Sequence, residues 1–70
     1  MSFRVTVHDE AGMWAMGGET DLNRAKREAR SMVETRSRKG GEKWTRVTPP
    51  MGVIAMWQNT KGDTIKVVST

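Results

Sequence analysis

The residues best suited to chemistry stand together near the start of the chain, where His8, Asp9 and Glu10 combine an imidazole with two carboxylates. In an extended strand His8 and Glu10 share one face because side chains alternate, but two ligands and a turn carboxylate do not complete a metal site. The chain has no second histidine and no cysteine to add a ligand. We interpret this cluster as a polar strand end that runs into a turn, and we predict no metal site.

Catalysis by His8 also lacks the groups that it needs. A general base acts on a neighbouring nucleophile, and no serine or cysteine arrangement of that kind is recognisable beside it. Gly17-Gly18 precede a helix start, where free N–H groups attract phosphate, but Glu19 and Asp21 place negative charge at the same corner. We therefore predict that the protein is not an enzyme and that it uses no cofactor and no small-molecule substrate.

Positive charge is concentrated in the middle of the chain. Residues 22–46 carry nine basic and three acidic side chains, a net charge of +6, whereas residues 1–21 have a net charge of −3. A basic helix with a basic exit loop can contact several phosphates of a nucleic acid. The candidate nucleic-acid contacts are Arg24, Arg27, Arg30, Arg36, Arg38, Lys39 and Lys43. A solvated helix face explains the same pattern, since Glu28 and Glu34 can form ordinary pairs along the helix with Arg24 and Arg30.

Alternation of apolar and polar residues predicts strands on both sides of this basic segment. The two-residue period in 2–8, 42–48 and 64–68 and the apolar runs at 13–16 and 53–57 predict five short strands. Pro49 and Pro50 cannot donate ladder hydrogen bonds, so we expect them in the turn between the third and fourth strands. Asn59-Thr60-Lys61-Gly62 predicts a hairpin turn in which Gly62 takes a left-handed conformation.

One amphipathic helix is predicted between the second and third strands. Thr20 or Asp21 can cap its first turn, and Gly40-Gly41 end it. Apolar residues at steps of three and four mark its inner face: Leu22, Ala25, Ala29, Met32 and Val33. The order β-β-α-β-β-β predicts a two-layer α+β fold, a mostly antiparallel sheet with the helix packed on one face. Residues 1–70 are expected to form a single domain.

Two strands carry apolar side chains in both directions, although one helix can cover only one face of a sheet. Residues 13–16 and 53–57 are apolar at consecutive positions, so their side chains point to both faces. Apolar groups left uncovered mark a contact site, and we predict a protein-binding face that pairs with a second copy or with another protein. Its candidate residues are Trp14, Met16, Ile54, Met56 and Trp57. At least one of the three tryptophans is expected in the core.

Phe3 to Val33, a hairpin that runs into Thr20-Asp21-Leu22-Asn23-Arg24-Ala25-Lys26-Arg27-Glu28-Ala29, resembles the start of HicB-type antitoxin domains. The Pro-Pro turn and the C-terminal hairpin depart from that pattern, and no separate DNA-binding segment follows, so no residue role is transferred. In size and in its use of Arg, Met and Trp the whole chain resembles small early proteins of bacteriophages that infect actinobacteria. That resemblance implies a protein that binds and redirects a host factor.

The composition predicts where the protein works. No apolar run approaches the roughly 20 residues that span a bilayer, the first residues do not look like a signal peptide, and cysteine is absent. We expect a soluble, cytoplasmic protein that does not enter a membrane. The predicted function is that of a small regulatory protein that acts through protein–protein contact, by self-association or on a host factor. The alternative is a nucleic-acid-binding domain that uses the basic helix and its exit loop.

Overall fold

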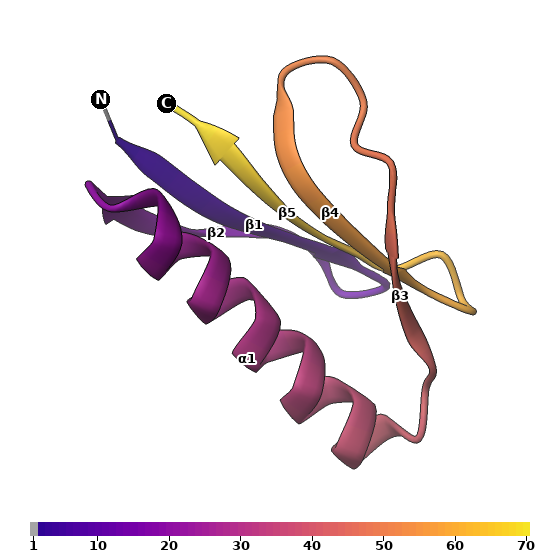
Figure 1. Ribbon diagram of the computed structural model, residues 1–70. Coiled ribbons are helices and arrows are strands. Elements are labelled where there is room, and N and C mark those ends of the chain that lie inside the picture. The colour runs from indigo at the N-terminus through magenta and orange to yellow at the C-terminus, as the bar shows by residue number, and fades with distance from the viewer. Residues whose placement is uncertain (1) are drawn as a thin grey trace.

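The computed structural model describes residues 2–70, which form five strands and one helix. The elements are β1 (Phe3–Asp9), β2 (Gly12–Glu19), α1 (Leu22–Gly40), β3 (Trp44–Val47), β4 (Val53–Asn59) and β5 (Thr64–Ser69). The strands form one antiparallel sheet in the order β2-β1-β5-β4-β3, and α1 lies along one face of it (Figure 1). The predicted α+β class and element order are confirmed.

Both ends of α1 are fixed by the residues that the sequence pattern selects. The Asp21 side chain caps the helix by accepting a hydrogen bond of 2.9 Å from the backbone N–H of Asn23. At the other end Gly41 has a φ of 66°, a left-handed conformation that glycine adopts without steric cost, and its N–H donates to the Ser37 carbonyl at 3.0 Å. Ala25 and Ala29 are fully buried, because small side chains let the helix approach the sheet closely.

The register of the central strands builds the core. Val5 on β1 lies opposite Val67 on β5, and Val7 lies opposite Ile65. On the next strand Trp57 lies opposite Ile65, so these side chains share the face that α1 covers. The buried apolar residues are Phe3, Val5, Val7, Ala25, Ala29, Ala55, Trp57, Ile65 and Val67. Trp57 is only 7% exposed, which confirms that a tryptophan belongs to the core.

The face of the sheet away from α1 is mixed rather than apolar. Thr6, Lys66 and Met56 occupy one row across β1, β5 and β4, and their side chains alternate with those that point toward the helix. On β1 the same face carries Arg4 and His8, both exposed. Polar and charged side chains therefore separate the apolar ones on this open face.

Three strands differ from the sequence-based expectation. β4 has a register shift, since Val53 pairs with Val68 while Ala55 pairs with Val67, so Val53 does not share a face with Ala55 as its spacing suggested. β2 does not stop at Gly17-Gly18 but includes both, with a register shift against β1 at that point. β3 is shorter than expected, because only residues 44–47 pair with β4.

Candidate protein-binding surface at the sheet edge

β2 forms one edge of the sheet and leaves its apolar side chains exposed on both faces. Met13 is 70% exposed, Trp14 is 41% exposed and Met16 is 44% exposed, and Ala15 between them is exposed as well. From Gly12 to Gly18 the strand contains no charged residue. An edge strand also presents backbone N–H and C=O groups that pair with no neighbour. We call residues 12–18 the β2 edge.

The two faces of the β2 edge follow from its pairing with β1. Trp14 lies opposite Val7 and Met16 lies opposite Val5, so both side chains are on the face that α1 covers. Met13 and Ala15 are on the open face. The helix packs against β1 and β5 more extensively than against β2, which leaves Trp14 and Met16 only partly covered.

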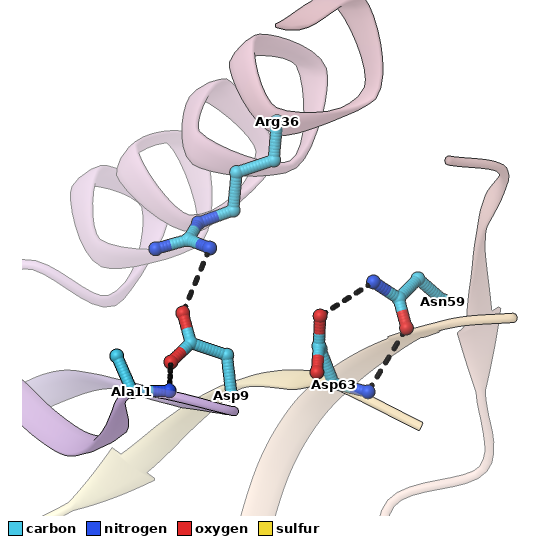
Figure 2. Close-up of polar contacts among 5 residues, drawn as sticks. All are labelled: Asp9, Ala11, Arg36, Asn59 and Asp63. Atoms are coloured by element: carbon cyan, nitrogen blue, oxygen red, sulfur yellow. Dashed lines mark hydrogen bonds and ion pairs between the residues drawn. The ribbon is translucent and has the colours of Figure 1, made fainter. Parts of the chain in front are cut away.

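Arg36 near the end of α1 fixes one side of the Trp14 ring. Its guanidinium carbon lies 5.3 Å from the ring centroid, within the range of a cation–π contact. Nη1 of the same residue donates a hydrogen bond of 3.1 Å to Oδ2 of Asp9, and Oδ1 of Asp9 accepts the backbone N–H of Ala11 at 2.8 Å (Figure 2). The turn between β1 and β2 is therefore tied to the helix, and Trp14 is held between the two.

A second polar cluster orders the turn between β4 and β5. Asn59 is 8% exposed, and its Oδ1 accepts the backbone N–H groups of Lys61 and Asp63, each at 2.9 Å. Its Nδ2 donates to Oδ2 of Asp63 at 2.9 Å (Figure 2). Gly62 has a φ of 93°, which confirms the left-handed position predicted for this turn. These bonds stabilise a tight turn, and they use both polar atoms of the Asn59 side chain, so Asn59 has a structural role.

A hollow of about 320 Å³ lies between this turn and the end of α1. Of its charged side chains, Lys61 pairs with Glu42 at 3.5 Å, and Arg36 pairs at 3.1 Å with Asp9, which lies outside the hollow. Within residues 2–70 the buried Nε1 of Trp44, at the same place, has no hydrogen-bond partner. The paired charges indicate a structural joint between helix and sheet rather than a binding pocket.

The structure brings together only part of the predicted protein-binding set. Trp14 and Met16 lie side by side along the β2 edge, whereas Trp57 is buried in the core with the Arg46 guanidinium carbon 5.6 Å from its ring centroid. Ile54 is half-buried and packs against the core, and Met56 is half-buried on the open face. Met13 and Ala15 join Trp14 and Met16 instead. The signal for them was the run of consecutive apolar residues in a strand that a single helix cannot cover.

The predicted basic set is divided in a similar way. Arg24 contacts Glu19 at 3.6 Å rather than Glu28, and Arg36 is engaged by Asp9 and Trp14. On the outer surface of α1, Arg27 and Arg30 line a hollow of about 230 Å³ together with Asn23 and Lys26, which was not in the predicted set. The remaining candidates are exposed at the end of the helix and just after it: Arg38, Lys39 and Lys43.

The described residues give no sign of a metal centre or a membrane span. Within residues 2–70 no group of three or more His, Cys, Asp or Glu side chains is placed to hold a metal ion. In the same part of the chain no helix is long and apolar enough to cross a bilayer. Comparison with family models, with curated proteins and with solved structures finds no significant match. The resemblances to HicB-type domains and to phage early proteins stay predictions.

Proposed function

We propose that this is a non-enzymatic binding protein that acts through protein–protein contact at the β2 edge. The observation that carries the proposal is a run of four exposed apolar residues on an edge strand: Met13, Trp14, Ala15 and Met16. A partner strand that pairs with β2 removes these side chains from water and satisfies the unpaired backbone groups in one step. Both gains come from the same seven-residue segment.

The residue types at the β2 edge suit a contact surface. Tryptophan and methionine are enriched in protein interfaces, and the flexible thioether of methionine adapts to the shape of a partner. Arg36 covers one face of Trp14 and restricts the ring, so less conformational freedom is lost when a partner covers the other face. The Trp14 ring is therefore prepared for binding before a partner arrives.

The proposal is tested by comparing two variants as baits for binding proteins. The double variant Trp14→Ser with Met16→Ser removes the surface, and Met51→Ser removes a still more exposed methionine that stands alone in the β3–β4 turn. We expect the wild type and Met51→Ser to retain a protein partner, which includes a second copy of the chain, after nuclease treatment and a high-salt wash. The double variant loses it. Equal capture by both variants, or capture that nuclease abolishes, argues against the proposal.

Nucleic-acid binding is a second candidate, and the outer surface of α1 favours it. The ion pairs within residues 2–70 involve Arg24, Arg36 and Lys61, so Lys26, Arg27 and Arg30 make none in the described part of the chain. Three cations around one hollow can follow a phosphate backbone. Such contacts release counterions, so the binding constant falls steeply with added salt.

The salt dependence tests this second candidate with a charge-matched control. Arg27→Ala with Arg30→Ala is expected to weaken binding to duplex DNA. The negative slope of log K against log salt is expected to become less steep by about 2. Arg4→Ala with Lys61→Ala removes the same charge elsewhere on the surface and is expected to leave that slope nearly unchanged. Equal slopes for the two double variants contradict a specific role for the outer surface of α1.

A further inference from the structure

We propose that the partner of the β2 edge is a second copy of this chain, joined by antiparallel pairing of the two β2 strands with the two copies of Ala15 facing each other across the twofold axis. The inference rests on the proposed function, because it names the occupant of the same surface. It follows from three features of the edge: its charge, the permitted register and the contrast with the opposite edge of the sheet.

The charge distribution fits a self-complementary contact. In a twofold contact residue i meets residue j and j meets i, and residues next to the axis meet their own copies, so a charged residue near the axis meets a like charge. Residues 12–18 carry none. Beyond this segment, Asp9 at the end of β1 and Glu19 at the end of β2 are already paired, with Arg36 at 3.1 Å and with Arg24 at 3.6 Å, and the exposed Glu10 lies in the turn before β2. Two copies can therefore approach along the β2 edge with little electrostatic repulsion.

The opposite edge of the sheet lacks these properties. β3 carries Arg46, and Lys43 directly precedes the strand. Pro49 and Pro50 follow it and cannot donate backbone hydrogen bonds to a partner strand. Charged residues and proline are the usual means by which an edge strand is kept from pairing. Of the two edge strands within residues 2–70, β2 is therefore the one free to extend the sheet.

The register follows from the alternation of side chains. When the twofold axis is perpendicular to the sheet, facing residues point to the same side of the sheet, so the axis passes midway between two copies of one residue. An axis at Ala15 uses the whole uncharged segment. It places Trp14 opposite Met16 of the partner subunit, a favourable contact between an aromatic ring and a sulfur.

The assembled dimer has a continuous ten-stranded sheet, because two five-stranded sheets join at β2. Both helices lie on the same side of this sheet. The helix packs mainly over β1 and β5 and less over β2, the strand where the second copy binds. Trp14 and Met16 of the two copies form an apolar strip between the helices.

A single cysteine variant tests both the contact and the register, since the natural chain has no cysteine. Residues that face each other across antiparallel strands have Cα atoms about 4.5 to 5.5 Å apart, within the range for a disulfide. In the Ala15→Cys variant, the cysteine thiols of two copies are oxidised to one disulfide. Oxidised glutathione is the oxidant, and it is reduced to two molecules of glutathione that carry the two thiol hydrogens. We expect dimer formation about tenfold faster than for Thr45→Cys, an exposed control on the β3 edge. Equal rates for the two variants overturn the proposal.

Sedimentation equilibrium supplies the second measurement. The mass of the wild type is expected to rise from monomer toward dimer between about 10 μM and about 1 mM. Ala15→Lys places two lysines face to face and is expected to stay monomeric, whereas Thr45→Lys is expected to dimerise like the wild type. Circular dichroism establishes that both lysine variants are folded. A wild type that remains monomeric at the highest concentration overturns the proposal.

The two proposals fail in different ways. A monomeric protein that still captures another protein, and loses it when Trp14 and Met16 are replaced, leaves the β2 edge as a binding surface but removes the second copy as its occupant. A monomeric protein whose capture of partners does not depend on these two residues removes both.

Discussion

The guanidinium of Arg36 stacks on the ring of Trp14 with 5.3 Å between its central carbon and the ring centroid. Arg36 belongs to the last part of α1 and Trp14 to the edge strand, so this contact connects the helix to the exposed surface. Because Arg36 also donates to Asp9 at 3.1 Å, one side chain holds the helix, the β1–β2 turn and the edge together. The order of the β2 edge thus depends on a residue outside it.

Replacing Arg36 is expected to loosen this joint. Arg36→Ala removes a partly buried ion pair and the cation–π contact, and we expect the free energy of unfolding to fall by about 1 to 2 kcal/mol. Urea unfolding measures the loss, and acrylamide quenching of tryptophan fluorescence is expected to increase. Arg38→Ala, at an exposed position two residues away, is expected to stay within about 0.5 kcal/mol of the wild type. Equal midpoints for both variants contradict the structural role given to Arg36.

Asn59 is expected to be the most sensitive polar residue of the β4–β5 hairpin. Asn59→Ala removes three hydrogen bonds around a buried position and is expected to lower the stability by about 2 kcal/mol. Thr60→Ala removes one exposed contact with Glu42 and is expected to cost about 0.5 kcal/mol. Thermal unfolding of the two variants gives the comparison. A loss at Thr60 as large as that at Asn59 shows that the turn is not organised by Asn59.

Gly62 is expected to resist replacement because of its backbone conformation and not because of its surroundings. A Cβ at Gly62 meets no atom within 4 Å, but the φ of 93° is unfavourable for any residue with a side chain. Gly62→Ala is expected to destabilise the protein by about 1 to 2 kcal/mol. Gly40→Ala, whose Cβ lies in ordinary contact 3.8 Å from Glu42, is expected to be neutral or to stabilise by up to about 1 kcal/mol. If Gly62→Ala and Gly40→Ala both lower the denaturant midpoint, backbone conformation is not what makes Gly62 sensitive.

The close approach of α1 to the sheet is expected to depend on its buried alanines. Ala29→Leu adds three carbons to a fully buried position, and we expect a loss of about 1 to 3 kcal/mol from overpacking. Arg30→Leu introduces the same side chain at the exposed neighbouring position and is expected to change stability by about 0.5 kcal/mol or less. Calorimetry of both variants distinguishes crowding from a general effect of leucine. A neutral Ala29→Leu shows that space remains between helix and sheet.

Local patterns were sufficient to predict the elements of this fold. The stripe that contains Ala25 and Ala29, the cap at Asp21 and the turn at Gly62 all depend on residues near each other in the chain, and all are confirmed. Each is a matter of backbone conformation or helical period. These features do not require knowledge of which strands pair.

The candidate surface was harder to predict because it depends on strand pairing. Trp14 and Met16 were grouped with Ile54, Met56 and Trp57, but the face on which a residue lies is set by its partner on the next strand. The shift between Val53 and Ala55 on β4 is invisible in the sequence, and it separates residues that simple alternation joins. The position of β2 at the edge was equally hidden, although it is the reason that its apolar residues stay exposed.

The place of β5 at the centre of the sheet affects how the chain is made. Ile65 and Val67 complete the core on Val5 and Val7, yet β5 comes after β1, β2, α1, β3 and β4 in the chain and is synthesised after them. Before β5 is added, β1 and β4 have no strand between them, so the nascent chain cannot form the core beneath α1. A stalled or truncated product thus exposes Val5 and Val7, which makes it a ready substrate for proteolytic quality control.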